Sequence, residues 1–142
     1  MLFENEKKAL KMIKIKGNAN VIKLHDVIED ANATYLIMEE CSGGTLQDYL
    51  KQKGKLTEDE TIEFSRKILS GAYSLIEQLI LHRDLKPANI MLRSSQNSQS
   101  LEPVIIDLGY SEIILAKKVL KAFNVGSPAY MSPEAYGKTM YS

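Results

Sequence analysis

Eight consecutive residues decide the fold of this chain: His82-Arg83-Asp84-Leu85-Lys86-Pro87-Ala88-Asn89. Two further motifs follow in order, Asp107-Leu108-Gly109 and Ser132-Pro133-Glu134. A single His-Arg-Asp triplet would mean little, because such triplets occur by chance in many proteins. Three separate motifs in a fixed order are far more specific. These motifs are therefore the basis for predicting both the architecture and the chemistry of the chain.

The side chains in these motifs suit phosphoryl transfer, which needs positioning and charge stabilisation more than covalent chemistry. Asp84 would orient a substrate hydroxyl and accept its proton, and Lys86 would hold the terminal phosphate as a fixed positive charge. Asn89 and Asp107 would bind magnesium ions through oxygen ligands. The predicted catalytic residues are thus Asp84 and Lys86, and the predicted metal ligands are Asn89 and Asp107.

On these motifs the chain resembles the eukaryotic protein kinases, over essentially all of its 142 residues. The resemblance runs from a helix like the family's αC to the end of its activation segment. Lys86, two residues after the aspartate, resembles the serine/threonine branch. The form of Gly126 to Glu134 is similar to that of the NIMA-related and autophagy-initiating kinases.

This resemblance implies an α+β fold, a partial protein-kinase-like fold. Residues 1–40 would be a remnant of the small lobe with antiparallel strands. Residues 41–142 would be the start of the helical large lobe through the activation segment. It also implies ATP and Mg²⁺ as cofactors and a protein with a Ser or Thr hydroxyl as the substrate.

The resemblance places further residues around the nucleotide. Met38 would be the gatekeeper, and residues 39–41 would be the hinge whose backbone binds adenine. Met91 would pack beneath the adenine ring. The full set of residues expected to bind the nucleotide or its metal is Met38, Glu39, Cys41, Lys86, Asn89, Met91 and Asp107.

Other expected roles are structural. Glu6 would be the αC glutamate that pairs with a strand lysine in this family. Ser127 would contact the catalytic aspartate and lysine, and Glu134 would pair with an arginine near the end of the domain. The family's regulatory spine would comprise Leu10, Leu24, His82 and Leu108.

The chain departs from the family pattern in several places. Asp107-Leu108-Gly109 replaces the commoner Asp-Phe-Gly, but it keeps the metal ligand and an apolar residue. No glycine-rich loop and no strand lysine of the Val-Ala-Ile-Lys type precede the motifs. Residues 116–125 contain no Ser or Thr, so activation by phosphorylation there is not predicted, although Arg83 would be available to bind a phosphate.

Two functional hypotheses follow. The leading one is a serine/threonine protein kinase, present here as a truncated catalytic domain. The alternative is a catalytically inactive, kinase-like fragment that binds another protein through exposed helical faces. The first helix and the stripe from Ile62 to Leu79 are the expected places for such binding.

Composition limits the other possibilities. Lys and Arg number 18, as do Asp and Glu, so the formal net charge is zero and neither nucleic acid nor an anionic membrane is an expected partner. The longest apolar runs are far shorter than a membrane-spanning helix requires. With one cysteine, Cys41, and an acidic N-terminus, the chain is expected in the cytoplasm, with the nucleus as an alternative. Cys41 itself could be a reactive thiol or an inert apolar side chain.

The sequence pattern also predicts local structure. Helices are expected from Leu2 to about Lys16, from a Thr45 cap to Gly54, and from a Thr57–Glu60 capping box to Leu79. The stripe Ile62, Ser65, Leu69, Ala72, Ile76 and Leu79 would face the core. Strands are expected at 21–27, 34–38, 90–92 and 104–106, with a polar loop over 93–100 and an irregular segment from Tyr110.

Overall fold

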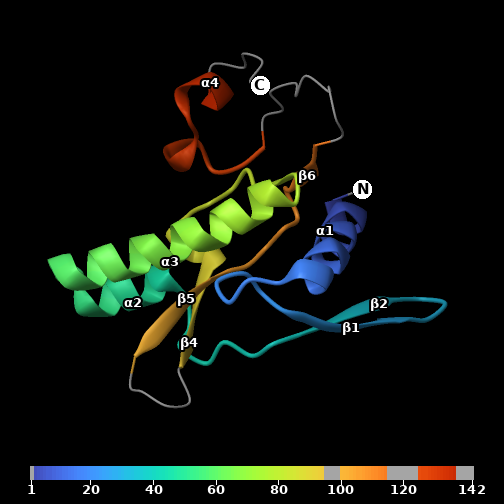
Figure 1. The fold of residues 1–142 in the computed structure, drawn as a ribbon, viewed down its shortest axis with the longest axis horizontal. Coiled ribbons are helices and arrows are strands. Elements are labelled where there is room, and N and C mark those ends of the chain that lie inside the picture. The colour runs from blue at the N-terminus through green and yellow to red at the C-terminus, as the bar shows by residue number, and fades with distance from the viewer. Residues whose placement is uncertain (1, 95–99, 115–124, 137–142) are drawn as a thin grey trace.

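The computed structural model describes residues 2–94, 100–114 and 125–136. Strands β4 and β5 lie between two groups of elements, α1 with the β1–β2 hairpin on one side and α2 with α3 on the other (Figure 1). The expected α+β class is confirmed. The elements are α1 (Leu2–Lys16), β1 (Leu24–Glu29), β2 (Thr34–Met38), α2 (Leu46–Lys53), α3 (Glu58–Glu77), β3 (Ile80–Leu81), η1 (Pro87–Asn89), β4 (Ile90–Ser94), β5 (Leu101–Ile105), β6 (Glu112–Ile113), η2 (Pro128–Tyr130) and α4 (Pro133–Tyr136).

Helix α1 has the predicted bounds, and its inner face carries Leu10 and Ile13, which are both buried. Phe3, which the helical pattern also places on the apolar face, is 41% exposed. The buried residues of α1 are Ala9, Leu10 and Ile13. The helix therefore contributes its second half, rather than its whole length, to the core.

Strands β1 and β2 form an antiparallel hairpin, as predicted, with Leu24 opposite Met38 and Glu29 opposite Thr34. The first strand begins at Leu24 rather than at Val21. The residues before it pair elsewhere, since the Ile22 N–H donates to the Ile105 carbonyl at 2.9 Å. The Ile105 N–H in turn donates to the Asn20 carbonyl at 2.9 Å, so this loop joins the two halves of the molecule.

Helices α2 and α3 begin at the predicted caps. The Thr45 side chain accepts a hydrogen bond from the Asp48 N–H, and Thr57 and Glu60 form a reciprocal capping box. Lys53, and then the Thr57 N–H, bind the Glu60 carboxylate and lower its pKa to about 2. Local sequence rules are sufficient here because each cap involves residues within one turn of helix.

The predicted core-facing stripe of α3 is wrong except at Ala72, which packs against the main core. The residues that α3 buries are Phe64, Gly71 and Leu75. By contrast Leu69 is 68% exposed and Ile76 is 53% exposed. Both faces of this helix carry apolar side chains, so periodicity alone does not show which one is covered. The choice is made by Gly71, which lies against the backbone of Asn20.

Gly71 gives a testable prediction about stability. A Cβ atom at this position would lie 2.6 Å from the Asn20 carbonyl oxygen, which is closer than van der Waals contact allows. Gly71→Ala is therefore expected to destabilise the fold by about 1–3 kcal/mol, although alanine normally favours a helix over glycine. Thermal unfolding of this variant can be compared with that of Ser65→Ala, at an exposed position of the same helix. A melting temperature at or above that of the unsubstituted protein would contradict this account of α3 packing.

The hairpin β4–β5 is antiparallel, with Ile90 opposite Ile105 at its base and Ser94 opposite Leu101 at its far end. Arg93 and Ser94, expected in a loop, belong to β4, and residues 95–99 of the expected loop lie outside the described residues. A short pair between β3 and β6 was not predicted. It involves two residues from each strand, which is too few to leave a sequence pattern.

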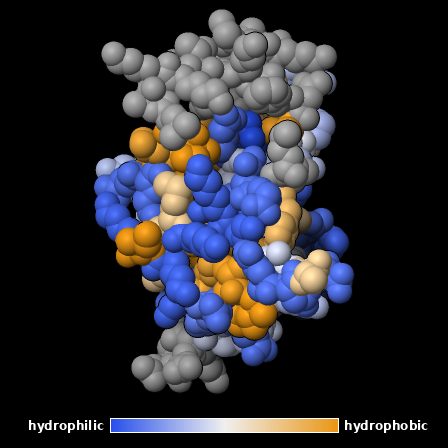
Figure 2. Space-filling view, turned by 90° about the vertical axis from the view of Figure 1, so that its right-hand side faces the viewer, coloured by the Kyte–Doolittle hydropathy of each residue, from blue (hydrophilic) through white to orange (hydrophobic). Residues whose placement is uncertain are grey.

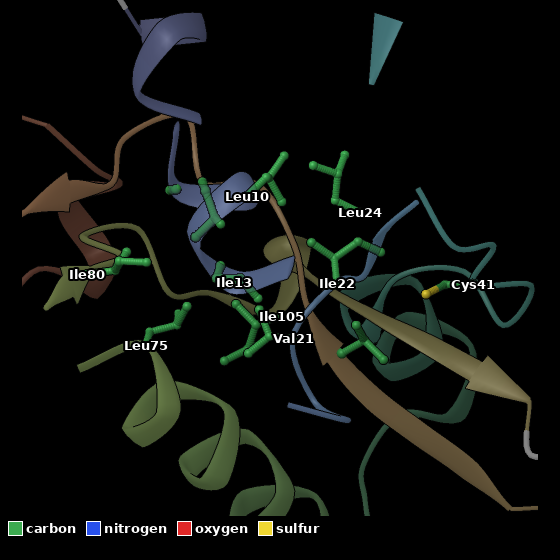
Figure 3. Packing of buried hydrophobic residues seen from close by; sticks show 12 residues of the cluster. Leu10, Ile13, Val21, Ile22, Leu24, Cys41, Leu75, Ile80 and Ile105 are labelled. Atoms are coloured by element: carbon green, nitrogen blue, oxygen red, sulfur yellow. The ribbon is translucent and has the colours of Figure 1, made fainter. Parts of the chain in front are cut away.

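The main core lies where α1, α3, β3 and β5 meet the loop before β1. Figure 3 shows its side chains pointing into this shared space. Its buried members are Ala9, Leu10, Ile13, Val21, Ile22, Leu24, Cys41, Leu75, Ile80, Val104, Ile105 and Leu108. A second cluster under α2 comprises Leu46, Phe64, Ile90 and Leu92. The first cluster includes two residues of β5 and the second includes two residues of β4, so core packing holds both strands of the hairpin.

The surface is mixed. Figure 2 shows separate apolar patches among hydrophilic side chains on the face of the molecule that it presents. Over the described residues, no helix combines the length and the apolar content that crossing a bilayer would require.

Candidate active site

The loop between β3 and η1 carries Asp84, whose side chain is almost fully buried. His82 supports this loop from both ring nitrogens. Its Nδ1 atom accepts a hydrogen bond from the Asp84 N–H at 3.3 Å, and its Nε2 atom lies 2.9 Å from the Ile106 carbonyl. Burial lowers the pKa of His82, which favours the neutral ring that these two bonds require. The structural role expected for His82 is consistent with this geometry.

The Asp84 carboxylate is held by three donors. Lys86 Nζ lies 2.7 Å from Oδ2, Asn89 Nδ2 lies 3.0 Å from the same oxygen, and the Ser127 N–H lies 2.8 Å from Oδ1. Burial raises the pKa of Asp84, but the bonds from Lys86 and Ser127 outweigh it, so the pKa falls below its ordinary value. The hydrogen bond to Asp84 raises the pKa of Lys86. Both groups are therefore charged at neutral pH.

Ser127 joins this cluster from a distant part of the chain, as the family resemblance implied. Its hydroxyl lies 2.7 Å from Lys86 Nζ. The preceding residue, Gly126, has φ of 102°, and a Cβ atom there would lie 2.5 Å from the Arg83 carbonyl. Only glycine fits at this position, because both the backbone angle and the close approach exclude a side chain. Gly126 is a site residue that the sequence reasoning missed, and the signal was its place directly before Ser127.

Asn89 and Asp107 lie together at the base of the β4–β5 hairpin. The Ile106 N–H donates to the Asn89 carbonyl at 3.0 Å, which places Asp107 beside Asn89. The Asn89 Nδ2 atom donates to Asp84, so its amide oxygen is left to accept a ligand. Asp107 is exposed, has φ of 59°, and accepts the Gly109 N–H at 3.1 Å through Oδ1. Its second carboxylate oxygen can thus serve as a ligand.

These oxygen donors fit a magnesium ion that arrives with a phosphate group. In the described part of the chain, no group of three or more His, Cys, Asp or Glu side chains could hold a metal ion. Mg²⁺ is commonly bound by one or two protein oxygens together with substrate phosphates and water. Asn89 and Asp107 supply that number and type of protein ligand.

The residues expected around adenine lie at the end of β2 and on β4. Met38 ends β2 and is 41% exposed, and Met91 is half-buried opposite Val104. Neither the Glu39 carbonyl nor the Cys41 N–H has a backbone hydrogen-bond partner within the described residues. Both groups are therefore free to bind a ligand, as the expected role of residues 39–41 requires.

Cys41 is buried, with 7% of its surface exposed. Burial and then the charge of Glu39 raise the pKa of its thiol. A protonated, buried thiol is a poor nucleophile, which favours the inert alternative for this cysteine.

The family model for the protein kinase domain matches residues 2–142. The chain belongs to the protein kinase family. Human serine/threonine-protein kinase ULK1 is 39% identical over 132 residues, which cover 89% of this chain and 12% of that protein. The expected similarity to the serine/threonine branch is confirmed by this and the other relatives.

Two plant kinases show similar agreement. Rice serine/threonine protein kinase OSK3 is 33% identical over 139 residues, covering 98% of this chain and 26% of that protein. The Arabidopsis thaliana SNF1-related protein kinase catalytic subunit alpha KIN12 is 36% identical over 132 residues, covering 93% of this chain and 26% of that protein. The chain thus spans about a quarter or less of the length of these curated relatives.

Glu6, the expected αC glutamate, lies in the first half of α1. It is half-buried on α1, and its pKa is raised by burial and by the charge of Asp107. The four expected spine residues, Leu10, Leu24, His82 and Leu108, are all buried. Their function as a spine stays a prediction.

Arg83, expected to be available to bind a phosphate, already binds two other groups of the chain. Its Nη1 atom lies 2.6 Å from Glu112 Oε2, and its Nε atom donates to the Tyr110 carbonyl at 2.7 Å. Both side chains of the ion pair are largely buried. The expectation overlooked Glu112, because the contact joins residues 29 positions apart. Residues 116–124 and the Glu134 side chain lie outside the described residues, so the predictions about them are not tested.

Proposed function

We propose that the protein containing this chain is a serine/threonine protein kinase that transfers the γ-phosphoryl group of Mg·ATP to Ser or Thr hydroxyls of proteins. The observation that supports this most directly is the ionised Asp84 carboxylate, held by Lys86 and Ser127 beside Asn89. Such an arrangement presents a base, a cation and a metal ligand within one short loop.

Each residue has a distinct role in this proposal. Asp84 orients the acceptor hydroxyl and takes its proton as the oxygen attacks phosphorus. Lys86, already bound to Asp84, places its positive charge where the transferred group gains negative charge. Magnesium held by Asn89 and Asp107 would neutralise the phosphates. The backbone of residues 39–41 would bind adenine, with Met38 and Met91 lining its seat.

The protein substrate and the location are also part of the proposal. The names of the relatives support Ser or Thr as the acceptor residue. A single buried, unpaired cysteine is consistent with a reducing, cytoplasmic setting. We retain the division into a small-lobe remnant over 1–40 and a large-lobe segment over 41–142, because the hinge segment lies at that boundary.

The metal role of Asp107 tests the proposal directly. Asp107→Asn removes a charged oxygen ligand and is expected to lower kcat/KM for phosphoryl transfer about a hundredfold, with partial recovery at high Mg²⁺ concentration. The assay uses the full-length protein, radiolabelled ATP and a mixture of Ser- and Thr-containing peptides, with Asp26→Asn on the exposed β1 strand as control. Equal Mg²⁺ dependence in the two variants would rule out the assigned ligand.

A second candidate function is protein binding without catalysis. It is favoured by the exposed apolar residues of α3, including Leu69, Tyr73 and Ile76. A cavity of about 500 Å³ adjoins Ile76 and is also lined by Leu85 and Met131. This surface would act as a docking face in a kinase-like fragment. The two candidates differ in one respect, since only the kinase needs the Asp84 carboxylate.

A further inference from the structure

Arg93, in β4, contacts three separate parts of the chain. Its Nη1 atom lies 2.7 Å from Glu39 Oε2, and its Nη2 atom lies 2.9 Å from Glu102 Oε2. The Nη2 atom also donates to the Ala19 carbonyl at 2.9 Å. One guanidinium thus joins the hinge segment (residues 39–41), the loop before β1 and strand β5. Nothing in the sequence predicted this contact, since Glu39 is 54 positions from Arg93.

Hydrogen bonds hold both the side chain and the backbone of Glu39. Its Oε1 atom accepts the Lys23 N–H at 2.9 Å, while its own N–H donates to the Lys23 carbonyl at 3.0 Å. Its side chain is 14% exposed and that of Arg93 is 25% exposed. Because the pair is partly shielded from water, its hydrogen bonds are stronger than those of a surface ion pair. The Glu39 backbone is thus held directly by Lys23, and Arg93 adds a further anchor through the carboxylate.

A cavity lies beside this contact, with a volume of about 450 Å³. Its lining includes Glu39, Arg93, Val21 and Leu24. Side chains do not fill this space, so packing does not support the hinge segment from that side. The hydrogen bonds that Glu39 makes with Arg93 and with the Lys23 backbone supply the support instead.

We infer that Arg93 is a positioning residue that holds the hinge segment in the geometry needed to bind adenine. The inference rests on the proposed function, because it assigns the free Glu39 carbonyl and Cys41 N–H to the nucleotide. Asp84, Lys86, Asn89 and Asp107 have no hydrogen bond or ion pair with Arg93 among the described residues. Loss of Arg93 should accordingly weaken nucleotide binding while the chemical step is retained.

The test compares Arg93→Gln and Arg93→Lys in the full-length protein, with Arg66→Gln on the exposed surface of α3 as the matched control. For Arg93→Gln, KM for ATP is expected to rise about tenfold, as is usual when a charge-assisted hydrogen bond is lost, and kcat to change less than twofold. For Arg93→Lys, KM for ATP should lie between the values of the unsubstituted protein and Arg93→Gln, since lysine keeps the charge but lacks the planar guanidinium group. An unchanged KM, or a fall in kcat alone, would overturn the inference.

Hydrogen exchange provides a readout that does not need catalysis. Amides in a peptide spanning residues 38–43 should exchange faster in Arg93→Gln than in Arg66→Gln, with β5 less affected. If the unsubstituted protein transfers no phosphate but this difference is present, the proposed function fails while the positioning of the hinge segment stands. If phosphate is transferred and the exchange rates are equal, the positioning role alone is wrong.

Discussion

Replacing Asp84 with asparagine is expected to lower kcat about a thousandfold while KM for ATP stays nearly constant. Asparagine preserves the shape of the side chain and can still accept the Ser127 N–H, but it cannot accept the proton of the acceptor hydroxyl. It also leaves Lys86 without its carboxylate partner, which now lies 2.7 Å away. Steady-state kinetics of the full-length protein with a peptide substrate measures both constants.

The control for this prediction is Asp59→Asn, which alters an exposed carboxylate in the first turn of α3. If Asp84→Asn retained more than a tenth of the activity, Asp84 would not be the base. If neither the unsubstituted protein nor the variant transfers phosphate, and both capture the same protein partner, the binding function becomes the better account.

The same substitution has a stability effect with a defined pH dependence. The pKa of Asp84 is lower in the folded protein than its ordinary value, so the ionised carboxylate stabilises the fold above the unfolded pKa of about 3.9. This contribution is lost as the pH falls through the folded pKa. The difference in melting temperature between the unsubstituted protein and Asp84→Asn should therefore shrink between pH 6 and pH 3.

Lys86→Met is expected to produce the second large effect, a fall in kcat of about 10²–10³-fold. Methionine keeps the apolar stem but removes the charge that would face the transferred phosphoryl group. It also removes the hydrogen bond from Lys86 that lowers the pKa of Asp84 against the effect of burial. The acid limb of kcat/KM should then move to higher pH, because Asp84 must lose its proton to act as a base.

A pH–rate profile of Lys86→Met checks both parts of this prediction. Lys53→Met is a suitable control, since Lys53 also pairs with a carboxylate, that of Glu60, but lies far from Asp84 in sequence and on α2. An acid limb at the same pH in Lys86→Met and in the unsubstituted protein would mean that Lys86 does not govern the ionisation of Asp84.

The sequence was most informative where structure depends on near neighbours. Thr45 and the Thr57–Glu60 pair predicted the starts of α2 and α3, because caps are satisfied within one helical turn. The cluster of Asp84, Lys86 and Asn89 was likewise predictable, since these residues share one short loop. Ser127 was placed beside them only through the family resemblance.

The features that were missed all depend on distant contacts. The buried face of α3 is set by Gly71 against Asn20, and Val21 lies outside β1 because the loop before that strand pairs with β5. The ion pairs Arg83–Glu112 and Arg93–Glu39 join residues far apart in the chain. Charged residues are common in any sequence, so nothing local distinguishes these four from solvated side chains.

The base of the β4–β5 hairpin has a consequence for how the chain can vary. Asn89 and Asp107 flank the pair formed by Ile90 and Ile105, so their separation in space is fixed where the hairpin begins. The number of residues between Ser94 and Leu101 has no part in that separation. An epitope or a fluorophore placed in this stretch is therefore expected to leave the spacing of the two proposed metal ligands unchanged.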